Sequence, residues 1–281
     1  MENFRAVNLS ILLYNRFMRL HRFYIPIELE NGLIYSHKAT EGDFEKNLIN
    51  QLFNVFRYTK DNEILLFTNQ KKEFKAKIRE IGSKILSYEI TDVKEPIKDN
   101  LKDIAIYVCL ALVKTDKFEL AVQKVTELGA YTIIPIKADR SIKRNIDIRR
   151  LERIIVEAAE QSGRVTIPNL VDTLSLKDAL VKMRQSREDY LEERETIALF
   201  LEPNTTPMQK VITPVLEKYK RDQKKGVDIW LFVGPEGGWS DTELSLCLEE
   251  KINAVSFNSN VLRTETAAIA AVSILTYIVE N

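Results

Sequence analysis

Apolar residues recur at two different spacings along the chain, and the change of spacing divides it into two parts. In the first part apolar and polar positions tend to alternate, as at Phe74, Ala76 and Ile78. Alternation is typical of strands with one buried face. We therefore expect a small β-rich domain over residues 18–92, followed by a charged linker over residues 93–102.

Residues 1–17 carry no clear structural pattern. A domain-like segment begins at Met18, and we treat the residues before it as an N-terminal extension. They either belong to the native protein or follow from an upstream start codon, and the sequence leaves both alternatives open.

From residue 103 to residue 281, short apolar runs alternate with stretches of helical spacing. The apolar runs predict strands at residues 104–113, 131–136, 197–201, 229–233 and 254–257. The helical spacing predicts helices over residues 117–128 and 148–162, each followed by a glycine that caps its end. Further helix starts are signalled by Thr206-Pro207, by the capping box of Ser240 and Glu243, and by Thr264. This order indicates an α/β domain with a mostly parallel sheet.

Composition narrows the class of protein. Lys and Arg number 41 and so do Asp and Glu, so any nucleic-acid binding must come from local basic patches. Cys109 and Cys247 both lie in apolar runs, which favours a reducing compartment and argues against disulfides and cysteine zinc sites. With two histidines in the chain we expect no metal site. No apolar run is long enough to span a membrane, so we expect a cytoplasmic protein.

Two turns near the C-terminus are the most informative segments. Residues 234–240, Gly-Pro-Glu-Gly-Gly-Trp-Ser, and residues 260–268, Asn-Val-Leu-Arg-Thr-Glu-Thr-Ala-Ala, each follow an apolar run and open a helix. If they follow neighbouring strands, they form one backbone-rich pocket at the carboxyl edge of the sheet. Ligands bind at that edge in open α/β sheets.

The glycine-rich turn matches neither common phosphate-binding motif. It lacks the Gly-Lys-Ser/Thr ending of a Walker loop and the G-x-G-x-x-G spacing of a dinucleotide-binding turn. Glu236 would also repel a phosphate. The turn therefore either serves only to reverse the chain before a helix or allows close approach of the backbone to an uncharged or cationic ligand.

The last helix opens with Arg263, Thr264 and Glu265. Thr264 is a natural N-cap, and Glu265 in the first turn complements the helix dipole. Arg263 is a cation at the positive end of the helix, which is unfavourable unless it serves an anion, a substrate or a partner. The following Ala-rich segment, residues 267–272, predicts a helix buried on several faces, either within the domain or in a dimer interface.

A basic cluster lies between residues 140 and 153, where Arg140, Lys143, Arg144 and Arg150 are among the cations. Further basic residues, among them Arg19 and Arg22, stand at the start of the β-rich part. Such a cluster is either a solvated face or a surface that follows the phosphates of a nucleic acid.

Together these segments resemble a known family. Residues 232–238 and 261–267 are similar to motifs of the SPOUT-class RNA methyltransferases, and within that class to the RsmE-type enzymes, which methylate uridine N3 in 16S ribosomal RNA. Two further segments resemble that family's signatures, residues 114–129 and the run from Glu157 to Arg164 followed by Pro168. The resemblance extends over nearly the whole chain from Met18.

The resemblance implies a PUA-like β-barrel domain, a C-terminal domain tied in a trefoil knot, a homodimer and S-adenosylmethionine (SAM) as cofactor. It implies that cofactor contacts are made by Leu201, Glu202, Phe232, Gly234, Pro235, Glu236, Gly237, Gly238, Phe257, Asn258, Val261, Leu262, Thr264, Thr266 and Ala267. We expect contacts to 16S ribosomal RNA, in the small ribosomal subunit, from Arg19, Arg22, Arg57, Arg140, Lys143, Arg144, Arg150 and Arg164. The chain departs from the family at residues 53–57, a loose match to its RNA-binding motif, and at Trp239, where an aliphatic residue is common.

Uracil N3 carries a proton at neutral pH, so methylation requires loss of that proton and stabilisation of the resulting charge. Arg263 is the expected source of the stabilising charge. Glu265 either acts as a base or orients the acceptor, or it only stabilises the start of the helix. Two rival functions remain open, a 2′-O-ribose methyltransferase of the same knotted class and an RNA-binding module without catalysis.

Overall fold

The computed structural model describes residues 20–69, 72–94, 103–143, 145–222, 226–257 and 260–280. The chain divides into two compact units, with the boundary between Ile97 and Lys98. Each unit has its own hydrophobic core.

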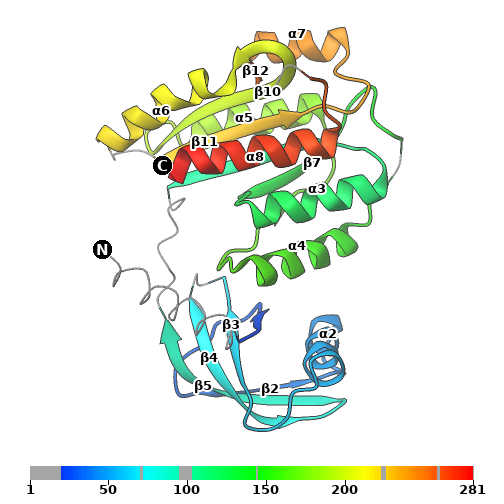
Figure 1. The fold of residues 1–281 in the computed structure, drawn as a ribbon, viewed down its shortest axis with the longest axis vertical. Helices are drawn as coiled ribbons and strands as arrows, with labels where there is room; N and C mark the ends of the chain where they lie inside the picture. The colour runs from blue at the N-terminus through cyan, green and yellow to red at the C-terminus, as the bar shows by residue number, and fades with distance from the viewer. Residues whose placement is uncertain are drawn as a thin grey trace, which may run out of the picture. The chain divides into compact units, whose positions relative to one another are not determined.

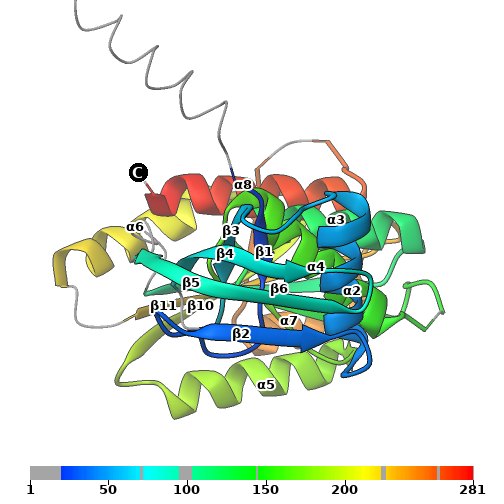
Figure 2. The same ribbon diagram turned by 90° about the horizontal axis from the view of Figure 1, so that it is seen from below.

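The N-terminal unit is built on a five-stranded sheet in the order β1-β3-β4-β5-β2. Its strands are β1 (Arg22–Tyr24), β2 (Ile34–Lys38), β3 (Glu63–Phe67), β4 (Glu73–Ile81) and β5 (Ile85–Lys94). The β1–β3 pairing is parallel and the others are antiparallel. The long strands β4 and β5 curve, so the sheet has the form of a half-barrel (Figure 2).

The alternating pattern is confirmed on β4, where Phe74, Ala76 and Ile78 are all buried. Strands β1, β2 and β5 were not predicted individually. The sequence reading missed a helix, α2 (Asp43–Asn50), and the π-helical turn Gln51–Val55 that continues it.

The C-terminal unit contains a sheet in the order β12-β10-β11-β6-β7-β8, with β9 also paired to β7. Its strands are β6 (Ile104–Ala111), β7 (Thr132–Lys137), β8 (Asn169–Leu170), β9 (Leu174–Ser175), β10 (Arg194–Pro207), β11 (Gly226–Val233) and β12 (Asn253–Ser256). Every pairing described in this sheet is parallel, which confirms the α/β prediction.

Helices cover both faces of this sheet (Figures 1 and 2). One face packs against α3 (Thr115–Glu127), α4 (Ile148–Ser162), α6 (Met208–Asp222) and α8 (Thr264–Glu280). The other packs against α5 (Leu176–Asp189) and α7 (Asp241–Glu249). The sheet is therefore buried on both sides, as its continuous apolar strands require.

Local signals placed most of these helices. Gly129 and Gly163 follow α3 and α4 with φ of 105° and 84°, in the left-handed region that suits glycine. Ser240 and Glu243 form the predicted capping box at the start of α7. Helix α5 was missed, although Ser175 caps its start and its buried residues recur at helical spacing.

The condition stated for the two turns, that they follow neighbouring strands, is not met, although both turns line one pocket. The two informative turns follow β11 and β12, which are not neighbours, because β10 pairs with both of them. The carboxyl ends of three strands rather than two therefore meet at this edge. The pairing of β10 with β12 shifts register between Leu201 and Thr206, so a short irregular segment of β10 also faces the edge.

Candidate active site

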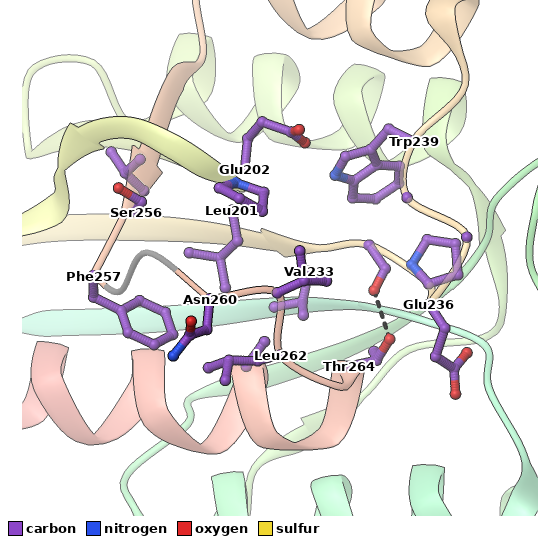
Figure 3. A pocket seen from close by; sticks show the side chains of 18 residues that line it. Leu201, Glu202, Val233, Glu236, Trp239, Ser256, Phe257, Asn260, Leu262 and Thr264 are labelled. Atoms are coloured by element: carbon purple, nitrogen blue, oxygen red, sulfur yellow. Dashed lines mark hydrogen bonds between the residues drawn. The ribbon is translucent and has the colours of Figure 1, made fainter.

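The two turns are joined directly by a hydrogen bond. The Thr264 hydroxyl donates to the carbonyl oxygen of Gly234 over 2.8 Å, drawn as a dashed line in Figure 3. Thr264 is thus the first residue of α8 with its hydroxyl turned to the other turn, rather than the N-cap that we predicted. The bond fixes the start of α8 against the end of β11.

A pocket of about 280 Å³ lies between the turns (Figure 3). Its walls come from the irregular segment of β10, the turn after β11, and the segment from β12 to α8. The lining residues are Leu201, Glu202, Pro203, Val233, Gly234, Pro235, Glu236, Gly237, Gly238, Trp239, Val255, Ser256, Phe257, Asn260, Val261, Leu262, Thr264 and Ala267. The volume is close to the lower end of the range for small-molecule sites.

Most of the residues expected to contact a cofactor line this pocket, but two lie elsewhere. Phe232 is fully buried on β11 and packs into the core between the sheet and α5 and α7. Thr266 is exposed on α8. Neither belongs to the described lining. Asn258 lies outside the described residues.

The list of expected cofactor contacts omitted six of the lining residues. They are Pro203, Val233, Trp239, Val255, Ser256 and Asn260. Trp239 and Asn260 stood in the two turns that were expected to form the pocket, but no contact was assigned to them. The other four adjoin residues that were named, so extending each predicted segment by one or two positions would have included them.

Arg140 holds the glycine-rich turn in place. Its Nη1 donates to the carbonyl oxygens of Gly237 over 2.9 Å and of Trp239 over 3.1 Å. The backbone N–H of the preceding Asp139 donates to Glu243 over 2.9 Å, which ties the same loop to the start of α7. The guanidinium that we expected on RNA therefore has a positioning role at the pocket.

Two glycines of the turn are needed for different reasons. A Cβ atom at Gly234 would lie 3.0 Å from the indole ring of Trp239, inside the pocket lining. A Cβ atom at Gly237 would lie 3.2 Å from the side chain of Arg140. The space beside Gly237 that a side chain would enter is thus bounded by the side chain of Arg140.

The charged side chains described in the pocket wall are all acidic. Glu202 and Glu236 contribute carboxyl groups, and none of the described lining residues is Lys, Arg or His. Burial raises the pKa of the Glu202 carboxyl above its usual value. The wall therefore favours an uncharged or cationic ligand over a phosphate.

The two catalytic candidates lie at the start of α8 and are not among the described lining residues. Arg263 is exposed, and its carbonyl oxygen accepts the first hydrogen bond of the helix, from Ala267. The Glu265 side chain is buried, and its Oε2 has no hydrogen-bond partner among the described residues.

Four of the cations expected on RNA are engaged within the protein. Arg22 is buried and pairs with Glu73 over 2.7 Å, so its geometry argues against a contact with RNA. Arg164 donates to the carbonyl oxygens of Thr126 and Ala130 and joins the ends of α3 and α4.

Arg140 belongs to the pocket turn, and Arg150 is exposed but paired with Glu119, which raises the pKa of its guanidinium. Arg57 and Lys143 are exposed. The last two candidates, Arg19 and Arg144, lie outside the described residues. Of the described candidates, Arg57 and Lys143 are thus the ones best placed to meet a nucleic acid.

Arg57 has a backbone conformation that is rare for a side chain of its size. Its φ is 55°, in the left-handed region, and it follows the π-helical turn. Both features are found more often at functional sites than elsewhere.

No metal-binding cluster of His, Cys, Asp and Glu is formed by the residues that the structure describes. Within the same residues, no helix has the length and apolarity needed to cross a bilayer.

The family model described as an RNA methyltransferase domain matches residues 100–276 of this chain. A relative from Rickettsia conorii, named ribosomal RNA small subunit methyltransferase E, is 30% identical over 220 residues, which cover 78% of this chain and 82% of the relative. The chain belongs to this family of methyltransferases, as its motifs predicted.

Other relatives agree with this assignment. A protein of the same name from Bacillus subtilis is 26% identical and covers 82% of this chain and 87% of its own length. A crystal structure of the Neisseria gonorrhoeae enzyme of that name, bound to S-adenosyl methionine, superposes with a TM-score of 0.76 at 26% identity. The superposition covers 92% of this chain and 98% of the other.

Proposed function

We propose that this chain transfers a methyl group from SAM to N3 of one uridine in the 16S RNA of the small ribosomal subunit. The observation that carries the proposal is the pocket held between two turns by the bond from Thr264 to Gly234. Relatives of the same family are small-subunit RNA methyltransferases, and one of them binds SAM.

The residues present fit SAM. The pocket has apolar walls for a purine, from Leu201, Phe257 and Leu262, and carboxyl groups but no described cationic side chain to meet a positively charged ligand. It also contains a buried indole N–H without a described acceptor, at Trp239. A zwitterionic nucleoside with an additional positive sulfonium suits such a wall better than a nucleotide does.

When bound, SAM supplies an electrophilic methyl group. The chain supplies orientation and charge. The Gly234–Gly238 turn offers backbone groups to the ligand, and Arg140 keeps that turn rigid. Rigid placement of reacting groups is itself a large part of catalysis.

The acceptor nitrogen must lose its proton, which places negative charge on the uracil oxygens. Arg263, exposed at the start of α8, stabilises this charge. The buried carboxylate of Glu265, one residue further on, orients the acceptor or takes up its proton. Since N3 lies on the Watson–Crick edge, the uridine must be unpaired or flipped out of a helix.

The same proposal covers the domains, the RNA contacts, the oligomeric state and the location of the protein. The half-barrel of the N-terminal unit is a PUA-like RNA-binding domain over residues 18–92, joined through residues 93–102 to a trefoil-knotted methyltransferase domain. Arg57 and Lys143 bind RNA phosphates. The protein is a cytoplasmic homodimer that acts on the small subunit, with α8 at the dimer interface.

Methylation of small-subunit particles that lack the modification, compared with naked 16S RNA, tests this function. Nucleoside mass spectrometry after the reaction with SAM should detect 3-methyluridine at one position. A methylated ribose would replace the proposed acceptor with a 2′-hydroxyl, and a chain that binds SAM but transfers no methyl group to either RNA form would not be the proposed enzyme.

A further inference from the structure

Aromatic side chains gather on the N-terminal unit, where β1 begins and the π-helical turn ends. The centre of the His21 ring lies 4.2 Å from that of Phe56 and 6.0 Å from that of Tyr58. The rings of Phe56 and Tyr58 in turn lie edge-on to Phe23, which is buried in the core of this unit. His21 itself is exposed. The cluster of His21, Phe56 and Tyr58 therefore places one accessible ring over two rings that are anchored in the core.

Hydrogen bonds fix the position of His21. Its Nδ1 shares a hydrogen bond of 2.7 Å with the Tyr58 hydroxyl. Its backbone carbonyl accepts a hydrogen bond from the N–H of Leu65 on β3 over 3.0 Å. Phe56 packs against one side of the ring, so the accessible surface of the ring lies away from Phe56. A ring that is already fixed loses little conformational freedom when a flat ligand stacks on it.

Exposed cations stand next to this cluster in the sequence. Arg57 is exposed, whereas the aromatic residues on either side of it are half-buried. The left-handed φ of 55° at Arg57 turns the chain between two residues whose rings both contact His21. Lys60 is also exposed, and residues 50–60 contain no Asp or Glu. The carboxylate that follows, Asp61, pairs with Lys77 over 3.1 Å.

An accessible aromatic ring beside exposed cations suits an unpaired nucleotide. Unpaired bases of RNA stack on aromatic side chains, histidine among them, while nearby cations meet the phosphates. In a duplex each base is covered by its neighbours in the stack. A duplex can therefore meet the cations but not the ring.

We propose that His21, supported by Phe56 and Tyr58, is a stacking site for one unpaired base of the RNA, and that Arg57 binds the adjacent phosphate. The inference rests on the proposed function, which assigns RNA binding to this unit through phosphates alone. Phosphate contacts position an RNA but carry little information about its bases. The stacking site adds a preference for single-stranded over double-stranded RNA.

The test is binding of the whole protein, followed by fluorescence anisotropy, to three RNAs. They are a short single strand, the same strand without its bases, and a duplex of the same sequence. His21→Leu keeps an apolar side chain but removes the ring, so it should bind the intact single strand roughly tenfold more weakly. Its affinity for the abasic strand and for the duplex should equal that of the wild type. His21→Phe restores a ring and should restore the affinity for the intact strand.

Arg57→Ala should behave differently, because a phosphate contact does not depend on the base. It should weaken the binding of all three RNAs and reduce the dependence of affinity on salt.

Tyr131→Ala is the matched control for the loss of an exposed aromatic ring. Tyr131 lies in the C-terminal unit, edge-on to Tyr107, and has no cation beside it in the sequence. This variant should leave all three affinities unchanged. Melting temperatures without RNA show whether each variant is folded.

Equal affinity of His21→Leu and wild type for the intact strand would overturn the inference, as would an equal loss for all three RNAs. A wild-type protein that binds none of the RNAs would also overturn it and leave this surface to a protein partner. Detection of 3-methyluridine on small subunits decides the proposed function separately. A chain that methylates subunits without a preference that depends on His21 rejects the inference alone, and a chain with that preference but no methyl transfer rejects the function alone.

Discussion

The two ends of the parallel sheet bury similar kinds of residues but use them differently. At the amino end, Asp228 is 1% exposed and pairs with Arg194 over 2.6 Å. The same guanidinium also donates to the carbonyl oxygen of Val227. At the carboxyl end, the indole of Trp239 and a carboxylate oxygen of Glu265 have no described partner.

The difference separates a structural cluster from a binding site. Polar groups that satisfy each other stabilise the fold and leave nothing for a ligand. Polar groups that are buried and unsatisfied are unfavourable in the free protein and become favourable when a ligand completes them. Substitutions at the carboxyl end should therefore change binding and turnover, and those at the amino end should change stability.

Arg263→Ala should have the largest effect on activity. Loss of one group that stabilises charge in the transition state lowers turnover by roughly 10²–10³-fold. Because Arg263 is exposed and outside the described lining, SAM affinity and the melting temperature should stay near wild type. Single-turnover methylation and calorimetry measure the two effects. An equal loss of binding and turnover would assign Arg263 to the cofactor instead.

Valine in place of Gly234 at the carboxyl end of the sheet, or of Gly226 at its amino end, compares the two ends directly. Valine at Gly234 would press on the indole ring 3.0 Å away, and this overpacking should displace the pocket lining and lower SAM affinity by roughly tenfold or more. At Gly226 the added Cβ would lie 2.8 Å from the carbonyl oxygen of Asp103. Gly226→Val should therefore unfold at a lower temperature but keep its SAM affinity while folded. A reversed pattern would contradict the division of roles.

Arg194→Ala should lower the free energy of unfolding by about 3 kcal/mol, because it leaves the buried carboxylate of Asp228 without its partner. Urea denaturation measures this change. Turnover and SAM affinity should be unchanged at temperatures where the variant is folded. A variant as stable as wild type, with weaker SAM binding, would show that the amino end also belongs to the site.

The smallest expected effect is a pH dependence of cofactor binding. Burial raises the pKa of Glu202 from its usual 4.5, so the carboxyl stays protonated to a higher pH than an exposed glutamate does. As the pH rises through this raised pKa, the carboxylate forms and becomes a better acceptor for a hydrogen bond from the ligand. Affinity for S-adenosylhomocysteine should then rise a few-fold. Glu202→Gln should remove the rise, and an unchanged pH profile in that variant would exclude Glu202 as its origin.

Features that depend on local chemistry could be predicted from the sequence. The two turns, the glycine that ends α4 and the capping box of α7 are each specified by a few adjacent residues. The alternation of strands and helices could also be predicted. Because the sheet is buried on both faces, its strands are continuous apolar runs in the sequence.

Contacts between distant residues could not be predicted. Arg140 reaches a turn 97 residues away, and Arg164 reaches carbonyls more than 30 residues away. Neither contact was predicted; both residues were expected on RNA, Arg140 as a member of the basic cluster. The position of β10 between β11 and β12 depends on strand pairing, which hydrophobic spacing does not encode.

The most direct test of the account is a crystal structure of the protein with bound S-adenosylhomocysteine. The account predicts that the ligand occupies the space between the Gly234–Gly238 turn and the start of α8. Density for the ligand at any other place, with this pocket filled only by solvent, would contradict it.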